Sequence, residues 1–109
     1  MSGMTHPTDD PILHRFKAAL HALYGGQLAR VVLFGSRARG EARPDSDHGI
    51  AVFLHTPPDQ RLERRRMADP RVDCLDETDA FFDTHAWPLD AWRERTPLMH
   101  EIRRDGVDV

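Results

Sequence analysis

The stretch VVLFGSRARGEARPDSDHGIAVFL, residues 31–54, decides the fold of this protein. An apolar run ends at Gly35-Ser36, ten residues follow, and Asp47 precedes a second apolar run. Short apolar runs that are bounded by turn residues are typical of buried β-strands. We therefore predict two strands joined by a polar loop, over residues 28–34 and 48–54.

Helices alternate with strands in the rest of the chain. Asp10-Pro11 and Thr96-Pro97 each place proline directly after a capping side chain, which is the typical start of a helix. The pattern predicts three helices, from Pro11 to the Gly25-Gly26 pair, over 59–69 with Pro70 as its end, and from Pro97 to Gly106. It predicts two further strands, over 80–87 and 107–109. We expect an α/β (α+β) fold in which helices pack on a small mixed sheet of three to four strands.

The composition is that of a soluble globular protein, with 39% hydrophobic and 30% charged residues. We predict a flexible tail over residues 1–10 and a single domain over 11–109. No apolar run approaches the ~20 residues that span a bilayer, and no export signal precedes the domain. The single cysteine, Cys74, fits a reducing cytoplasm.

The net charge of −3 does not favour a general affinity for nucleic acid, which requires clustered cations. The densest basic patch lies between Arg61 and Arg66, and we interpret it as the solvated face of a helix.

The turn after the first strand has the residues that bind phosphate. Gly35 lets the backbone approach an anion closely, and the Ser36 hydroxyl can donate a hydrogen bond. Residues 36–40 are compatible with a short helix, whose free N–H groups would add donors. Arg37 and Arg39 supply cations that pair with phosphate oxygens. These four residues are the predicted nucleotide-binding set.

The start of the second strand is the predicted place for a metal ion. Side chains alternate along a strand, so positions 47 and 49 point the same way, about 6.6 Å apart. Two carboxylates there would bind Mg²⁺. Asp47 is present, but the second position is Gly49, and His48 projects to the opposite face.

This segment resembles the signature of the minimal nucleotidyltransferases of the DNA polymerase beta superfamily. In that family Gly-Ser is followed by ten residues and Asp-x-Asp, and here Gly35-Ser36 is followed by ten residues and Asp47-His48-Gly49. The C-terminal RERTPLMHEIRRDGVDV is also similar to the family's closing helix and strand. The resemblance therefore extends from about Ile12 to Val109.

The resemblance implies a polymerase-beta-like nucleotidyltransferase fold that binds ATP at Gly35 and Ser36 and holds Mg²⁺ with carboxylates. The implied reaction is in-line attack on the α-phosphorus, which transfers AMP and releases pyrophosphate. Family members of this size are commonly antitoxins of HEPN-type toxins, and some add AMP to a tyrosine of the toxin. The implied assembly is a hetero-oligomer with that toxin.

The chain departs from the family at two of the three carboxylate positions. The second aspartate is Gly49, and aligning the next strand on Pro88 places the third position at His85. Asp83 lies one same-face step upstream and is a candidate substitute. We therefore take Asp47, Asp83 and His85 as candidate catalytic residues, and Asp47 and Asp83 as candidate metal ligands. The other interpretations are a partly buried His85 bonded to backbone and a solvated Asp83.

Two functions follow from this pattern. The first is an antitoxin whose AMP transfer is impaired, with weak Mg²⁺-assisted ATP binding. The second is an inactive antitoxin that neutralises its toxin by complex formation alone. AMP transfer to a small molecule is a third possibility, but such relatives usually carry a second substrate domain, which this chain lacks.

Overall fold

The structure is a computed structural model, and it describes residues 10–41, 47–78 and 81–109. A four-stranded mixed sheet lies at its centre, in the order β3-β2-β1-β4. Strand β1 pairs antiparallel with both β2 and β4, whereas β2 and β3 are parallel. The strands are β1 (Leu28–Phe34), β2 (His48–Leu54), β3 (Phe82–Pro88) and β4 (Val107–Asp108).

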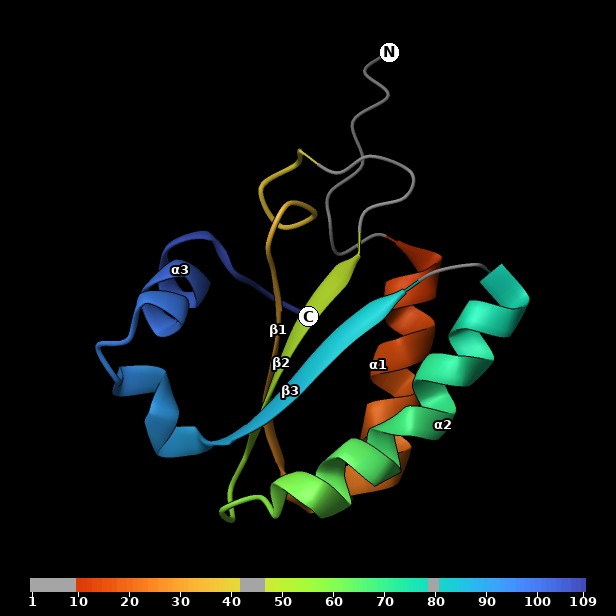
Figure 1. The fold of residues 1–109 in the computed structure, drawn as a ribbon, viewed down its shortest axis with the longest axis horizontal. Coiled ribbons are helices and arrows are strands. Elements are labelled where there is room, and N and C mark those ends of the chain that lie inside the picture. The colour runs from red at the N-terminus through yellow and green to blue at the C-terminus, as the bar shows by residue number, and fades with distance from the viewer. Residues whose placement is uncertain (1–9, 42–46, 79–80) are drawn as a thin grey trace.

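Helices cover the two faces of the sheet unequally (Figure 1). The helices α1 (Pro11–Tyr24) and α2 (Gln60–Thr78) lie on one face, and α3 (Pro97–Asp105) lies on the other. Two short 3₁₀ turns, η2 (Gly25–Gln27) and η3 (Leu89–Arg93), follow α1 and β3. None of the helices in the described part of the chain is both long and apolar enough to cross a membrane.

Strand alternation divides the apolar side chains into two cores. Leu33 and Ile50 face α1 and α2, where they join Phe16 in the larger core. Val32 and Phe53 face α3, in a core with residues of α3 and η3. Because the central strands are apolar on both faces, they read in the sequence as continuous apolar runs.

The predicted fold class and both central strands are confirmed. The helix starts at Pro11 and Pro97 are confirmed as well: Asp10 accepts a hydrogen bond from Ile12 N at 2.9 Å, and Thr96 Oγ1 accepts one from Met99 N at 3.2 Å. A side-chain oxygen thus satisfies one free N–H group at the start of each helix.

The prediction that Pro70 ends the second helix was wrong, since α2 continues to Thr78. Proline inside a helix removes one hydrogen bond and costs about 3 kcal/mol. Packing of α2 against α1 and β3, with Met67 buried between them, compensates for that loss.

Two smaller predictions also differ from the structure. Residues 36–40 form successive turns, not a short helix. The third strand runs from Phe82 to Pro88 instead of over 80–87, and residues 79 and 80 lie outside the described part of the chain. Residues 1–9 of the predicted tail lie outside it as well.

Candidate functional site

The turn after β1 holds all four predicted nucleotide-binding residues, Gly35, Ser36, Arg37 and Arg39. Gly35 has φ 86°, a conformation that side chains other than glycine rarely adopt. Its carbonyl accepts hydrogen bonds from Ala38 N at 3.1 Å and Arg39 N at 3.2 Å, and Glu41 N donates to Ser36 O at 2.9 Å. The chain therefore folds back on itself directly after the strand, and Ser36 is half-buried at its end.

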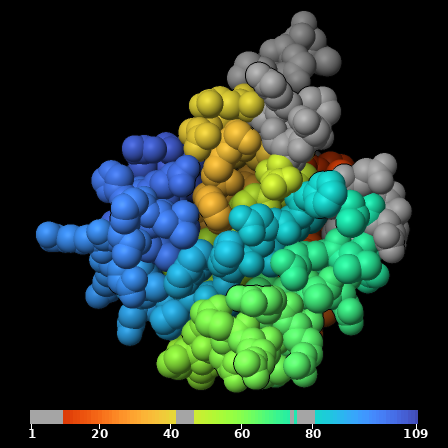
Figure 2. Space-filling model, viewed as in Figure 1, coloured from red at the N-terminus to blue at the C-terminus, as the bar shows by residue number. Residues whose placement is uncertain are grey.

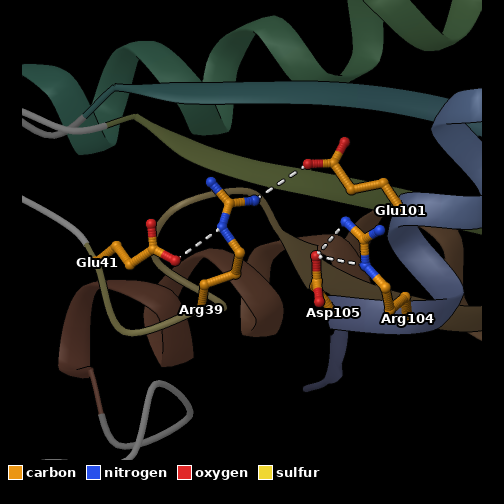
Figure 3. Close-up of polar contacts among 5 residues, drawn as sticks. All are labelled: Arg39, Glu41, Glu101, Arg104 and Asp105. Atoms are coloured by element: carbon orange, nitrogen blue, oxygen red, sulfur yellow. Dashed lines mark hydrogen bonds and ion pairs between the residues drawn. The ribbon is translucent and has the colours of Figure 1, made fainter.

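Arg39 joins this turn to α3 (Figure 3). Its guanidinium contacts Glu41 Oε1 at 3.3 Å and Glu101 Oε1 at 3.1 Å. A phosphate that approached Arg39 would therefore compete with two carboxylates. Glu101 was not among the predicted site residues, because its proximity to Arg39 depends on how α3 packs.

A second ion pair, between Arg104 and Asp105 of α3, lies beside the pair of Arg39 and Glu101 (Figure 3). Arg104 donates to Asp105 Oδ2 at 2.9 Å, and this hydrogen bond lowers the pKa of the Asp105 carboxyl below its ordinary value. The positive charge of Arg39 contributes to the same effect. The charge of Arg39 in the turn thus acts on the carboxylate of Asp105 at the end of α3.

The turn after β1 shares one surface with the start of β2 and with β3 (Figure 2). We call the part formed by Asp47, Gly49, Asp83 and His85 the open face. The register of the sheet places Gly49 opposite Asp83 and Ala51 opposite His85. Asp47 precedes β2 and is exposed. The structure therefore places Asp83 and His85 on one face of β3, with Asp47 exposed directly before the neighbouring strand.

Asp83 and His85 form an exposed pair on this face. His85 Nε2 lies 3.0 Å from Asp83 Oδ1, and the side chains are 52% and 60% exposed. The interpretation of His85 as a partly buried residue bonded to backbone is therefore wrong. A carboxylate that accepts from one ring nitrogen leaves the other nitrogen available to accept a proton.

His48 points away from the open face, as strand alternation predicts, and is only 2% exposed. Its ring stacks on Phe82 with centroids 4.5 Å apart, and Nε2 lies 2.9 Å from Asp10 Oδ2. Burial alone would raise the pKa of Asp10, but the hydrogen bonds from His48 and Ile12 N outweigh it and lower that pKa. This pair fixes the start of α1 against β2 beside Asp47.

The described residues do not fit a metal pair. They contain no group of three or more His, Cys, Asp or Glu side chains placed to hold one ion. Gly49 offers no ligand between Asp47 and Asp83, and Asp83 is already hydrogen-bonded to His85. Carboxylate oxygens are the ligands that Mg²⁺ prefers, so this face lacks the donors for two ions.

Comparison with known proteins gives a family match. The family model described as the nucleotidyltransferase domain matches residues 13–81. This range includes the turn after β1, Asp47 and Gly49. No protein with a curated functional description matches the chain.

Solved structures share the fold. One described as a minimal nucleotidyltransferase is 25% identical, with a TM-score of 0.60 and full coverage of both chains. A toxin–antitoxin crystal structure with AMP-PNP is 20% identical, with a TM-score of 0.61, covering 85% of this chain and 68% of that one. A mutant of the toxin–antitoxin MntA-HpeT is 18% identical, with a TM-score of 0.59 and coverage of 84% and 68%.

Proposed function

Because this chain belongs to the nucleotidyltransferase domain family, we propose that it is an antitoxin of the minimal-nucleotidyltransferase type. In this proposal it binds a HEPN-type toxin in the cytoplasm and neutralises it chiefly by forming a complex. It binds ATP weakly at Gly35 and Ser36, and AMP transfer is strongly impaired. The fold shared with toxin–antitoxin structures supports the partner class.

The observation that carries this proposal is the contrast between the turn and the open face. The turn after β1 keeps Gly35 in its left-handed conformation with Ser36 beside it, as a phosphate cradle requires. The open face lacks a carboxylate at Gly49, between Asp47 and Asp83. Positioning and charge neutralisation supply most of the catalysis of phosphoryl transfer. The chain thus keeps the features for binding and has lost one needed for fast chemistry.

A slow residual AMP transfer is the second candidate function, and the Asp83–His85 pair favours it. In this reaction a hydroxyl oxygen of the partner bonds to the α-phosphorus, and the bond to pyrophosphate breaks. With His85 Nε2 paired to Asp83 at 3.0 Å, Nδ1 would accept the hydroxyl proton. The arginines of the turn would balance charge on the phosphates.

The mass of the partner separates these two functions. A HEPN-type toxin, the partner class of this proposal, is incubated with the protein and ATP, and its intact mass is measured. We expect a stable complex and an inactive toxin, with AMP added to no more than a small fraction of the toxin. A toxin that is neutralised only when it carries AMP would contradict neutralisation by complex formation. A toxin that forms no complex would contradict the antitoxin proposal itself.

Ser36→Ala is expected to weaken ATP binding by about ten- to a hundredfold, because a hydrogen bond to a charged phosphate contributes about 1.5–3 kcal/mol. Calorimetry at millimolar ATP measures this. The matched control is Thr56→Ala, an exposed hydroxyl in the bend that follows the other end of β2. Equal affinities of the Ser36→Ala variant and the parent protein would contradict the nucleotide site.

A further inference from the structure

We propose that Phe34 and Gly49 form a coupled pair that closes the place of a second metal-binding carboxylate on the open face. Phe34 is the last residue of β1, and the antiparallel register places it directly opposite Gly49. A Cβ atom added to Gly49 would lie 3.2 Å from Phe34 Cε2 and 3.2 Å from Cζ. It would also lie 2.9 Å from the Phe34 carbonyl oxygen. A side chain at position 49 would thus begin in tight contact with both the carbonyl oxygen and the ring of Phe34.

Gly49 is required here for space and not for its backbone conformation. Gly35 and Gly40 have φ values of 86° and 74°, which explain their identity, whereas Gly49 lies in regular β2 without positive φ. Glycine within a strand costs stability, and an aromatic ring on the neighbouring strand is a known compensation. Phe34 and Gly49 therefore stabilise the sheet as a pair.

The ring is also held in its place from the side of α3. Phe34 is half-buried and packs against the core that contains Val32, Ala51 and Phe53. Moving the ring aside would cost those contacts, so the cover over Gly49 is a fixed part of the fold. A carboxylate gained at position 49 alone would meet the ring before it could reach a metal ion beside Asp47.

The Phe34–Gly49 pair determines how many substitutions a metal pair on the open face would require. Loss of one carboxylate would leave a gap that a single reversion could fill. Here the neighbouring strand fills that gap with apolar bulk, so a metal pair requires two changes together. The inference deepens the proposed function, on which it rests, by explaining why AMP transfer is impaired. It can be tested without ATP or toxin, so its failure and the failure of the proposed function are distinguishable.

The test compares four proteins: the parent, Gly49→Asp, Phe34→Val, and the double variant. Thermal unfolding and calorimetric titration with Mg²⁺ alone are measured for each. We expect Gly49→Asp to lower Tm by about 10 °C because of overpacking, and to bind no Mg²⁺. The double variant should recover at least half of that loss and bind Mg²⁺ at millimolar concentration. A second double variant, Phe34→Val with Gly49→Asn, should recover Tm without binding Mg²⁺.

Two results would overturn the proposal. One is a Gly49→Asp protein that keeps the parent's Tm or binds Mg²⁺ as tightly as the double variant, which would show that the ring excludes nothing. The other is an equal loss of Tm when Gly49→Asp is introduced into the parent protein and into the Phe34→Val background, which would assign the exclusion to the backbone carbonyl alone. If Gly49→Asp does not fold, Gly49→Ala in the same two backgrounds gives the comparison of Tm.

Discussion

Gly106→Ala is expected to lower the free energy of unfolding by about 3 kcal/mol, a large loss for a domain of this size. Gly106 follows α3, and its N–H donates to Ile102 O at 2.9 Å. A Cβ atom there would collide with the Ile102 carbonyl oxygen and lie 2.6 Å from Val32 Cγ1. Its φ of −67° suits any residue, so the constraint is the space between α3 and the sheet. Urea unfolding monitored by circular dichroism measures the effect.

The matched control is Gly26→Ala, where an added Cβ would meet no atom within 4 Å. This variant should unfold within about 1 kcal/mol of the parent protein, because alanine also restricts the unfolded chain. Equal stabilities of the two variants would show that α3 moves away from the sheet without cost.

His48→Ala is expected to cost about 3 kcal/mol, because it leaves a cavity beside Phe82 and removes the hydrogen bond to Asp10. The loss should be larger at pH 5 and above than in acid of about pH 2. Urea unfolding at several pH values measures it, with the exposed His55→Ala as control. A His48→Ala protein as stable as the parent would show that the pair contributes nothing to the attachment of α1.

The pH dependence follows from the pKa of Asp10, which is lower in the folded protein than its ordinary value of 3.8. A carboxyl with a lowered pKa contributes stability above its ordinary pKa, and this contribution is lost as pH falls through the lower, folded value. His48→Ala removes one cause of the lowering, so its stability should fall less between pH 5 and acid conditions of about pH 2. An unchanged acid dependence would assign the lowered pKa to the backbone N–H groups of Ile12 and Leu13 alone.

Some of this structure could be predicted because local chemistry decides it. The strands β1 and β2 match the predicted residues, since each is an apolar run with turn residues or charges at its ends. The helix starts at Pro11 and Pro97 follow from one capping side chain each. Pro70 misled the prediction because its cost is local, whereas the packing that offsets it comes from α1 and β3.

In the candidate site, too, local sequence predicts some features, whereas others depend on tertiary packing. Alternation along a strand is enough to place Asp47 and Gly49 on one face and His48 on the other. The contacts of Phe34 with Gly49 and of Asp10 with His48 depend on which strands and helices become neighbours. No local pattern encodes these pairs, because the partners are 15 and 38 residues apart in the sequence.

The late position of α3 and β4 in the chain determines the order in which the two cores are completed during synthesis. Val32 lies opposite Asp108, so this pairing forms only after the whole sheet and α3 have left the ribosome. The core facing α1 and α2 can close once β3 has been made, whereas Val32, Ala51 and Phe53 wait for α3. A nascent chain therefore exposes an apolar sheet face until α3 emerges. Chaperones that recognise apolar surfaces have that interval in which to act.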